Sequence, residues 1–220
     1  MIISSFGGGS LLSYKLIDQN LKNEYKYLGQ FDYNNGQPVY NASNPVQLIL
    51  SEDPAACAPC VYVINKTDNS IETIVRSDFK TSSNFESLST TTTIKNPVTF
   101  TFTYTHEEQY KITKTLTINK DSYLSNHQAK IDNMDGKNRL VGLAWDKGLG
   151  YTENTFLSIE IANDVAAYMG IDNSYETFKH GDGVAKENNA DWLAIRNKYF
   201  TLAFIGEKTY TVEVDAKDLD

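Results

Sequence analysis

Two closely spaced cysteines are the residues whose arrangement most directly suggests chemistry. Cys57 and Cys60 form a Cys-Ala-Pro-Cys segment, and such a pair exchanges disulfides when its first thiol lies at a helix N-terminus, where the dipole lowers its pKa. Here Pro54 precedes the pair, Pro59 lies within it, and residues 61–64 are typical of a strand. We therefore favour a small loop disulfide or two free thiols. A metal half-site and a redox pair stay as alternatives, although two thiolates alone do not close a zinc site.

Three histidines are the candidate acid–base groups. They are His106 in a polar turn, His127 in a strand-like stretch and His180 beside a glycine-rich turn. The sequence spacing singles out no carboxylate or nucleophile as a catalytic partner of these histidines. Glu107 and Glu108 fall in the polar turn itself. No Gly-x-Ser-x-Gly, His-Glu-x-x-His, phosphate-loop or EF-hand pattern occurs. The sequence therefore predicts no catalytic, cofactor-binding or metal site, and gives the histidines structural or exposed positions.

Alternation of apolar and polar residues is the main structural signal, and it is clearest in residues 98–118. Apolar residues occupy every second position on both sides of the turn at 106–109, with Thr and Lys between them. This period of two predicts a half-buried antiparallel hairpin. Lys114 falls among the apolar positions, so we expect one end of that face to meet solvent. Shorter patterns of the same kind predict strands within residues 45–50, 70–77, 157–161 and 210–214.

Few segments have a helical pattern, and none separates domains. Residues 163–171 and 190–195 each predict a short helix, the first capped by Asn163 or Asp164. The glycines at 7–9 predict a tight turn between strands, because glycine tolerates positive φ. Segment 82–93 predicts a long loop. With no linker and no internal repeat, we expect one mainly β, antiparallel sandwich domain over residues 1–220.

The composition limits the classes of partner. The chain has 220 residues, of which 40% are hydrophobic and 22% charged, with a net charge of −8. This is an ordinary globular composition. The acidic balance argues against nucleic acid and against adhesion to anionic lipid. No run reaches the roughly 18–20 apolar residues of a membrane span, and the first ten residues lack a signal-peptide pattern. We expect a soluble chain, monomeric, with any export signal or anchor outside it.

Residues 191–205 are the most apolar stretch of the sequence. A buried core element, an exposed partner surface and a membrane contact are the three interpretations. Polar and charged residues at 196–198 would have to be desolvated in a membrane contact. We favour the core, where Trp192, Tyr199 and Phe200 would each contribute about 1.5–3 kcal/mol by burial. A partner-facing role stays open.

Several stretches, in the same order along the chain, resemble the large periplasmic domain of the YidC family of bacterial membrane protein insertases. Residues 101–133 resemble its central hairpin and the following turn and strand. Residues 143–154 resemble its Trp-x-x-Gly-Leu-Gly segment, and residues 191–205 its Trp…Lys-Tyr-Phe…Ala stretch. Residues 4–16 resemble its early glycine turn, whereas residues 51–95 do not align. The matching positions are Tyr110, Thr113, Lys114, Thr115, Lys120, Asp121, Tyr123, Trp145, Gly148, Leu149, Gly150, Trp192, Lys198, Tyr199, Phe200 and Ala203.

This resemblance implies a β-supersandwich related to the galactose-mutarotase fold, on the periplasmic side of the bacterial inner membrane. It implies a fragment of a longer membrane protein that helps other proteins insert and fold. The implied partners are Sec translocon subunits and nascent membrane proteins, with no cofactor. The family's hydrophilic groove among transmembrane helices is absent from this chain. Core or partner-facing roles then fall to Trp145, Trp192, Tyr199 and Phe200.

Two other functions stay open from the sequence. A sugar-binding module or aldose-epimerase-like enzyme on the same sandwich would need an acid and a base facing each other across a cleft. The histidines and carboxylates could supply them, but no spacing singles out a pair. A surface or adhesin-like β module would also fit the strands rich in Thr and Asn.

Overall fold

The computed structural model describes residues 1–34, 37–50, 57–82, 94–120, 122–146, 149, 164–169, 174–178, 182–197 and 199–216. These residues form antiparallel strands, with no helix among them, so the prediction of a mainly β chain is confirmed. None of the described segments is a helix of the length and hydropathy that a membrane span requires. The supersandwich itself stays a prediction.

The chain divides into two compact units, which are described separately. Unit 1 comprises Met1–Tyr14 and Ser51–Lys147, and unit 2 comprises Lys15–Leu50 and Gly148–Asp220. Each unit is therefore built from two stretches far apart in the sequence. The single domain expected over residues 1–220 stays a prediction.

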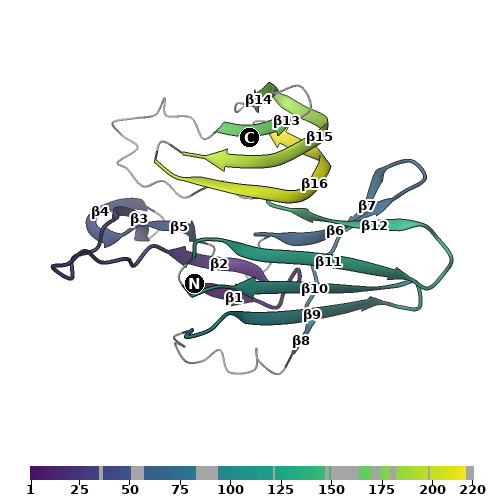
Figure 1. Ribbon diagram of the computed structural model, residues 1–220, viewed down its shortest axis with the longest axis horizontal. Helices are drawn as coiled ribbons and strands as arrows, with labels where there is room; N and C mark the ends of the chain where they lie inside the picture. The colour runs from purple at the N-terminus through teal and green to yellow at the C-terminus, as the bar shows by residue number, and fades with distance from the viewer. Residues whose placement is uncertain are drawn as a thin grey trace. The chain divides into compact units, whose positions relative to one another are not determined.

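Unit 1 contains a four-stranded sheet in the order β11-β10-β9-β8 and a three-stranded sheet in the order β12-β6-β7. Strand β1 pairs with β2 beside them (Figure 1). Their bounds are β1 Ile2–Ser4, β2 Ser10–Lys15, β6 Cys60–Asn65, β7 Ser70–Ile74, β8 Lys80–Thr81, β9 Val98–His106, β10 Tyr110–Ile118, β11 Ser125–Asn133 and β12 Arg139–Ala144.

The predicted hairpin of residues 98–118 is confirmed as β9 and β10, which pair in continuous register from Tyr110↔His106 to Ile118↔Val98. Every second residue of β10 is buried, because one face of the hairpin packs in the core of unit 1. That core combines residues of both sheets and of the segment between β7 and β8: Val61, Val63, Val75, Phe79, Phe100, Phe102, Tyr110, Ile112, Leu116 and Ile118.

Lys114 occupies one of the buried positions of β10, and its exposed fraction is 0%. The expectation that this end of the face meets solvent is therefore wrong. Its long aliphatic stem fits an apolar position, and its ammonium group finds a hydrogen-bond acceptor inside the unit. The alternation pattern correctly assigned its face but not its exposure.

The turn predicted at residues 7–9 connects β1 and β2, and all three glycines have positive φ. Gly9 also lies against the core, because a Cβ at this position would come within 2.5 Å of the Phe102 ring. Gly136, in the turn after β11, has a similar φ of +76° but would meet nothing within 4 Å. Substitutions at Gly9 and Gly136 can therefore separate the cost of backbone strain from the cost of steric overlap.

We expect Gly136→Ala to lower the free energy of unfolding by about 1 kcal/mol, the cost of a left-handed alanine. Gly9→Ala should lower it by about 2–4 kcal/mol, because the added methyl group also overpacks Phe102. Urea unfolding of both variants measures the difference. Equal losses of unfolding free energy in the two variants would show that the Gly9 turn can shift to accept the methyl group without disturbing the core.

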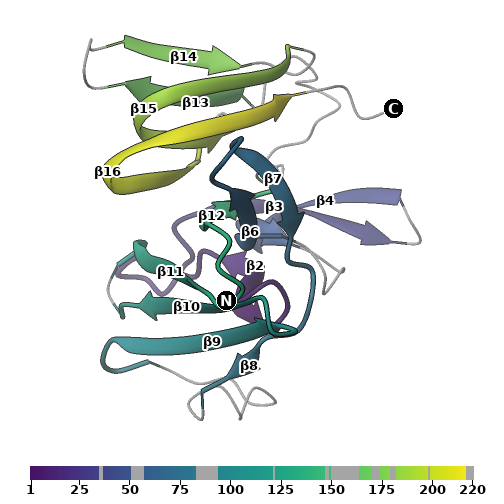
Figure 2. The same ribbon diagram turned by 90° about the vertical axis from the view of Figure 1, so that its right-hand side faces the viewer.

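Unit 2 contains a four-stranded sheet in the order β14-β13-β15-β16 and the two-stranded pair β3-β4 (Figure 2). Its described core is small, with Phe178 and Val214 packed against Ala185, Leu193 and Val212. The bounds are β3 Leu28–Asn34, β4 Gln37–Pro45, β5 Gln47–Leu50, β13 Asp164–Met169, β14 Ser174–Phe178, β15 Gly183–Arg196 and β16 Thr201–Ala216.

The two short helices predicted from the sequence are wrong in the residues described. Residues 164–169 form β13, and residues 190–195 lie within β15. The two strands pair with each other, with Ala166 opposite Ala194 and Tyr168 opposite Trp192. The local alanine-rich composition favours a helix only weakly, so this long-range strand pairing overrides it.

The remaining strand predictions are confirmed where the structure describes them. Residues 47–50 form β5, residues 70–74 form β7, and residues 210–214 lie within β16. The strand predicted at residues 157–161, the loop at 83–93 and His180 lie outside the described residues.

Candidate functional site

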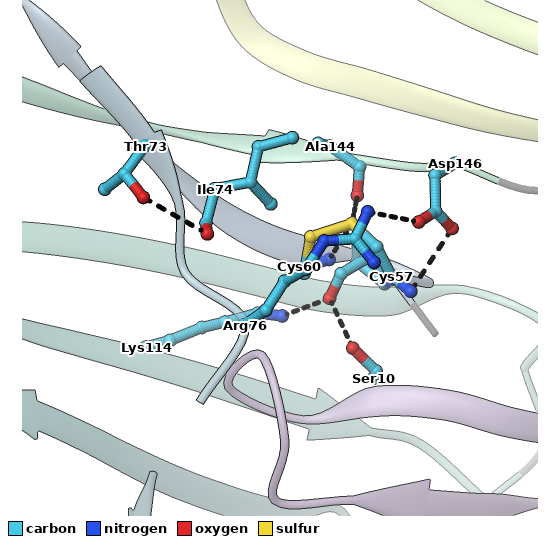
Figure 3. The surroundings of a disulfide bond; sticks show 10 residues. Ser10, Cys57, Cys60, Thr73, Ile74, Arg76, Lys114, Ala144 and Asp146 are labelled. Atoms are coloured by element: carbon cyan, nitrogen blue, oxygen red, sulfur yellow. Dashed lines mark hydrogen bonds and ion pairs between the residues drawn. A yellow bond between two sulfur atoms is a disulfide. The ribbon is translucent and has the colours of Figure 1, made fainter. Parts of the chain in front are cut away.

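The Cys-Ala-Pro-Cys segment lies in the core of unit 1, where a disulfide joins Cys57 to Cys60 (Figure 3). Their exposed fractions are 1% and 2%. The backbone N–H of Cys57 donates to the Asp146 carboxylate at 3.2 Å, and the N–H of Cys60 donates to the Cys57 sulfur at 3.2 Å. Burial of both sulfurs differs from the partly exposed setting of a reactive thiol. The geometry thus favours a structural loop disulfide.

The carbonyl between the two cysteines is the acceptor for the buried lysine. Lys114 Nζ donates to the Pro59 oxygen at 2.8 Å, and the Ser10 hydroxyl donates to the same oxygen at 3.5 Å. Figure 3 shows both groups converging on it from different strands. Gly8 lies close above the lysine stem, since a Cβ there would be 3.2 Å from Lys114 Cδ. Burial lowers the pKa of Lys114 to about 7, because the interior disfavours the charged amine.

A second, half-buried base lies on the neighbouring strand. His127 is on β11, directly opposite Leu116 of β10, and its Nε2 is 3.0 Å from the Ser125 hydroxyl. Among the described residues, its buried Nδ1 has no hydrogen-bond partner. Burial, and then the charge of Lys114, lowers the pKa of His127 to about 4. The folded chain therefore favours the neutral form of His127.

His106 has a different setting, at the end of β9. Its ring lies between those of Tyr104 and Tyr110, with centroids at 6.2 Å and 5.0 Å, and its Nδ1 is 3.2 Å from the Tyr104 hydroxyl. Hydroxyl groups and rings, rather than carboxylates, are the neighbours of His106 and His127 in the contacts seen. The structure does not bring these two histidines together as an acid–base pair.

The candidate aromatic residues occupy different environments. Trp145 follows β12 in unit 1 and is half-buried, as is Trp192 in β15. Phe200 is also half-buried, and its ring meets that of Tyr27 edge-on at 6.0 Å. Tyr199 is 59% exposed, so the favoured interpretation of a core anchor is wrong for this residue. It lies in the turn between β15 and β16, where strand alternation no longer holds it inward.

One face of the unit 2 sheet carries a row of apolar residues across the strands, exposed at Tyr175 and Ile205 and half-buried at Trp192. Trp192 of β15 is opposite Ile205 of β16 and also opposite Tyr168 of β13, which is in turn opposite Tyr175 of β14. Directly opposed residues of an antiparallel sheet share a face. We call the surface formed by Tyr175, Trp192 and Ile205 the outer face.

Comparison with known proteins places the chain. A family model described as the YidC periplasmic domain matches residues 35–220. The chain belongs to this family. A curated relative, "Membrane protein insertase YidC" of Chlorobium luteolum, is 32% identical over 130 residues, which cover 55% of this chain and 22% of the relative. This YidC domain therefore matches only about a fifth of that relative's length. The family match includes residues 51–95, which motif comparison alone left unaligned.

A buried arginine in the YidC domain was missed from the sequence. Arg139 of β12 has a side chain only 1% exposed. It donates to Glu72 at 2.7 Å, to both oxygens of Asp135 at 2.7 and 2.9 Å, and to Gln109 at 3.5 Å. Its guanidinium also lies 5.1 Å from the centroid of the Tyr110 ring. These contacts join β7, β12 and two turns. The cluster therefore has a structural role.

The chemistry of this cluster follows from its geometry. Hydrogen bonds from Arg139 lower the pKa of Asp135 to about 2, because they favour the charged carboxylate. Spacing could have suggested only the Asp135–Arg139 contact around the turn. Glu72 lies 67 residues away in the sequence, so no local signal could have found it.

Proposed function

We propose that this YidC domain acts without catalysis, as a polypeptide-binding part of a membrane protein insertase on the periplasmic side of the inner membrane. Its partners are Sec translocon subunits or nascent membrane proteins, and it assists their insertion and folding. The observation that carries the proposal is the family match over residues 35–220. The supersandwich architecture and the location belong to the same proposal.

Two structural features support this role. The Cys57–Cys60 disulfide fits an oxidising compartment such as the periplasm, since disulfides rarely persist in the cytosol. In unit 2, β14 and β16 end the order of the four-stranded sheet. Edge strands can accept an extended peptide through their backbone groups.

Site-specific photo-crosslinking in living cells tests the proposal. A photoreactive amino acid would replace Tyr123, Tyr175 or Tyr199 in turn, because all three side chains are exposed. We expect adducts with Sec subunits or with nascent membrane proteins from at least one position. Absence of such adducts from all three positions would contradict the proposal. Rapid equilibration of α-glucose by the purified chain, followed by optical rotation, would contradict the absence of catalysis.

A further inference from the structure

The outer face of unit 2 is exposed at both edges of its sheet. Tyr175 on β14 is 65% exposed, and Ile205 on β16 is 72% exposed, while Trp192 between them is half-buried. Small side chains flank Trp192 on its own strand at Ala190 and Ala194. An exposed apolar surface of this kind marks an interaction site more often than isolated apolar residues do.

An irregularity interrupts the pairing of β15 with β16 next to this surface. The register between β15 and β16 shifts between Ala190 and Trp192, so that Ile205 and Tyr210 oppose β15 residues only two apart. The Tyr210 ring occupies the space where a Cβ on Gly206 would lie. Only glycine therefore fits at this position, and the half-exposed ring of Tyr210 packs over the backbone of Gly206, which follows Ile205 in the chain. Bulges often serve to redirect a side chain in this way.

The charge of the chain is concentrated in the same unit. Unit 2 contains sixteen Asp and Glu and nine Lys and Arg, a net charge of −7, whereas unit 1 contains twelve and eleven, a net charge of −1. On β16 itself, Glu207 follows Ile205 by two residues, and Glu213 and Asp215 follow Tyr210; all three are exposed. The apolar surface thus has acidic residues beside it.

We propose that the outer face binds a polypeptide segment in which apolar side chains are flanked by Lys or Arg. This inference rests on the proposed function and names the surface and the chemistry of the partner. The apolar side chains pack on Tyr175, Trp192 and Ile205, and the basic residues face the acidic surroundings. Complementary charge of this kind speeds association and suppresses wrong partners.

The same charge distribution disfavours two other occupants. A second copy of the chain would bring another acidic surface against this one, and like charges oppose such an approach. An anionic lipid surface is repelled for the same reason. A basic, apolar segment is the occupant that satisfies both the apolar row and the charge around it.

A binding assay with labelled peptides tests the inference on the whole 220-residue chain. One probe has an apolar centre with lysines at both ends, and the other has the same centre with glutamates. The variants are Ile205→Thr and Tyr175→Thr, both at exposed positions. The matched control is Ile71→Thr, which removes the same apolar side chain from exposed β7 in unit 1. All three changes leave the net charge unaltered.

We expect the lysine-flanked peptide to bind, and Ile205→Thr to weaken it at least about tenfold. Tyr175→Thr should weaken it similarly, and Ile71→Thr should leave it unchanged. Added salt should weaken binding further. The inference fails if neither peptide binds, if the glutamate-flanked peptide binds equally well, or if all three variants bind like the original chain.

The outcomes separate this inference from the proposed function. Crosslinks to Sec subunits or nascent chains from Tyr123 or Tyr199, with outer-face variants that bind normally, would overturn the surface assignment but leave the function standing. Absence of crosslinks from all three positions would remove the function as well. Circular dichroism of Ile205→Thr and Ile71→Thr checks that both variants remain folded.

Discussion

Replacing Lys114 with Met will remove most of the pH dependence of stability of this YidC domain between pH 7 and 10.5. The side chain is fully buried, and burial lowers its pKa from 10.5 to about 7. Met has a similar length and no charge, so it fills the same space without the desolvation cost. At neutral pH we expect Lys114→Met to be the more stable protein.

The direction of the effect follows from which state holds the proton. Below pH 7 the amine is protonated in both states, and the folded chain contains a buried charge. Between pH 7 and 10.5 the unfolded chain keeps a proton that the folded chain has lost, so the free energy of unfolding rises with pH. From the shift of the pKa, the rise attributable to Lys114 is about 4 kcal/mol. Urea unfolding at a series of pH values measures it.

Lys111→Met is the matched control, because Lys111 lies on the same strand and is exposed. We expect this variant to keep the pH dependence of the original chain. Parallel curves for Lys114→Met and the original chain would show that Lys114 is not the titrating group. His127 offers a second readout: its pKa, lowered to about 4 by burial and by Lys114, should rise in Lys114→Met and can be followed by NMR.

Arg139→Met should lower the free energy of unfolding by about 2–4 kcal/mol at neutral pH, because it leaves carboxylates without their partner. The side chain is 1% exposed and bonds both Asp135 and Glu72. Since the pKa of Asp135 is lowered from 3.8 to about 2, the loss should be present above pH 4. It should shrink as the pH falls through 2 and the carboxylate becomes neutral.

Arg76→Met is the control for this comparison. Arg76 also pairs with an aspartate, Asp146, at 3.1 Å, but its side chain is 49% exposed. Exposed pairs of this kind contribute little, so we expect a loss of less than about 1 kcal/mol. Urea unfolding of the two variants gives the comparison. Equal losses would contradict the view that burial makes the Arg139 cluster important.

The wrong predictions for Lys114 and for the two helices share a physical origin in contacts between distant residues. The pattern around Lys114 gave its face correctly, but the acceptor that lets it be buried, the Pro59 carbonyl, lies 55 residues away. The helices predicted at 163–171 and 190–195 failed because those segments pair with each other as β13 and β15. In each case the local residues were compatible with more than one outcome.

The sequence by itself determined the β class, the central hairpin of β9 and β10, the glycine turn at residues 7–9 and the resemblance to the YidC family. These features follow from alternation, turn chemistry and motif order. Such signals are read along the sequence and do not depend on which distant residues pack together. Only the tertiary structure decided that Lys114 is buried and that Arg139 meets Glu72. It also decided that Tyr175, Trp192 and Ile205 share one face, because strand register joins residues that no sequence spacing relates.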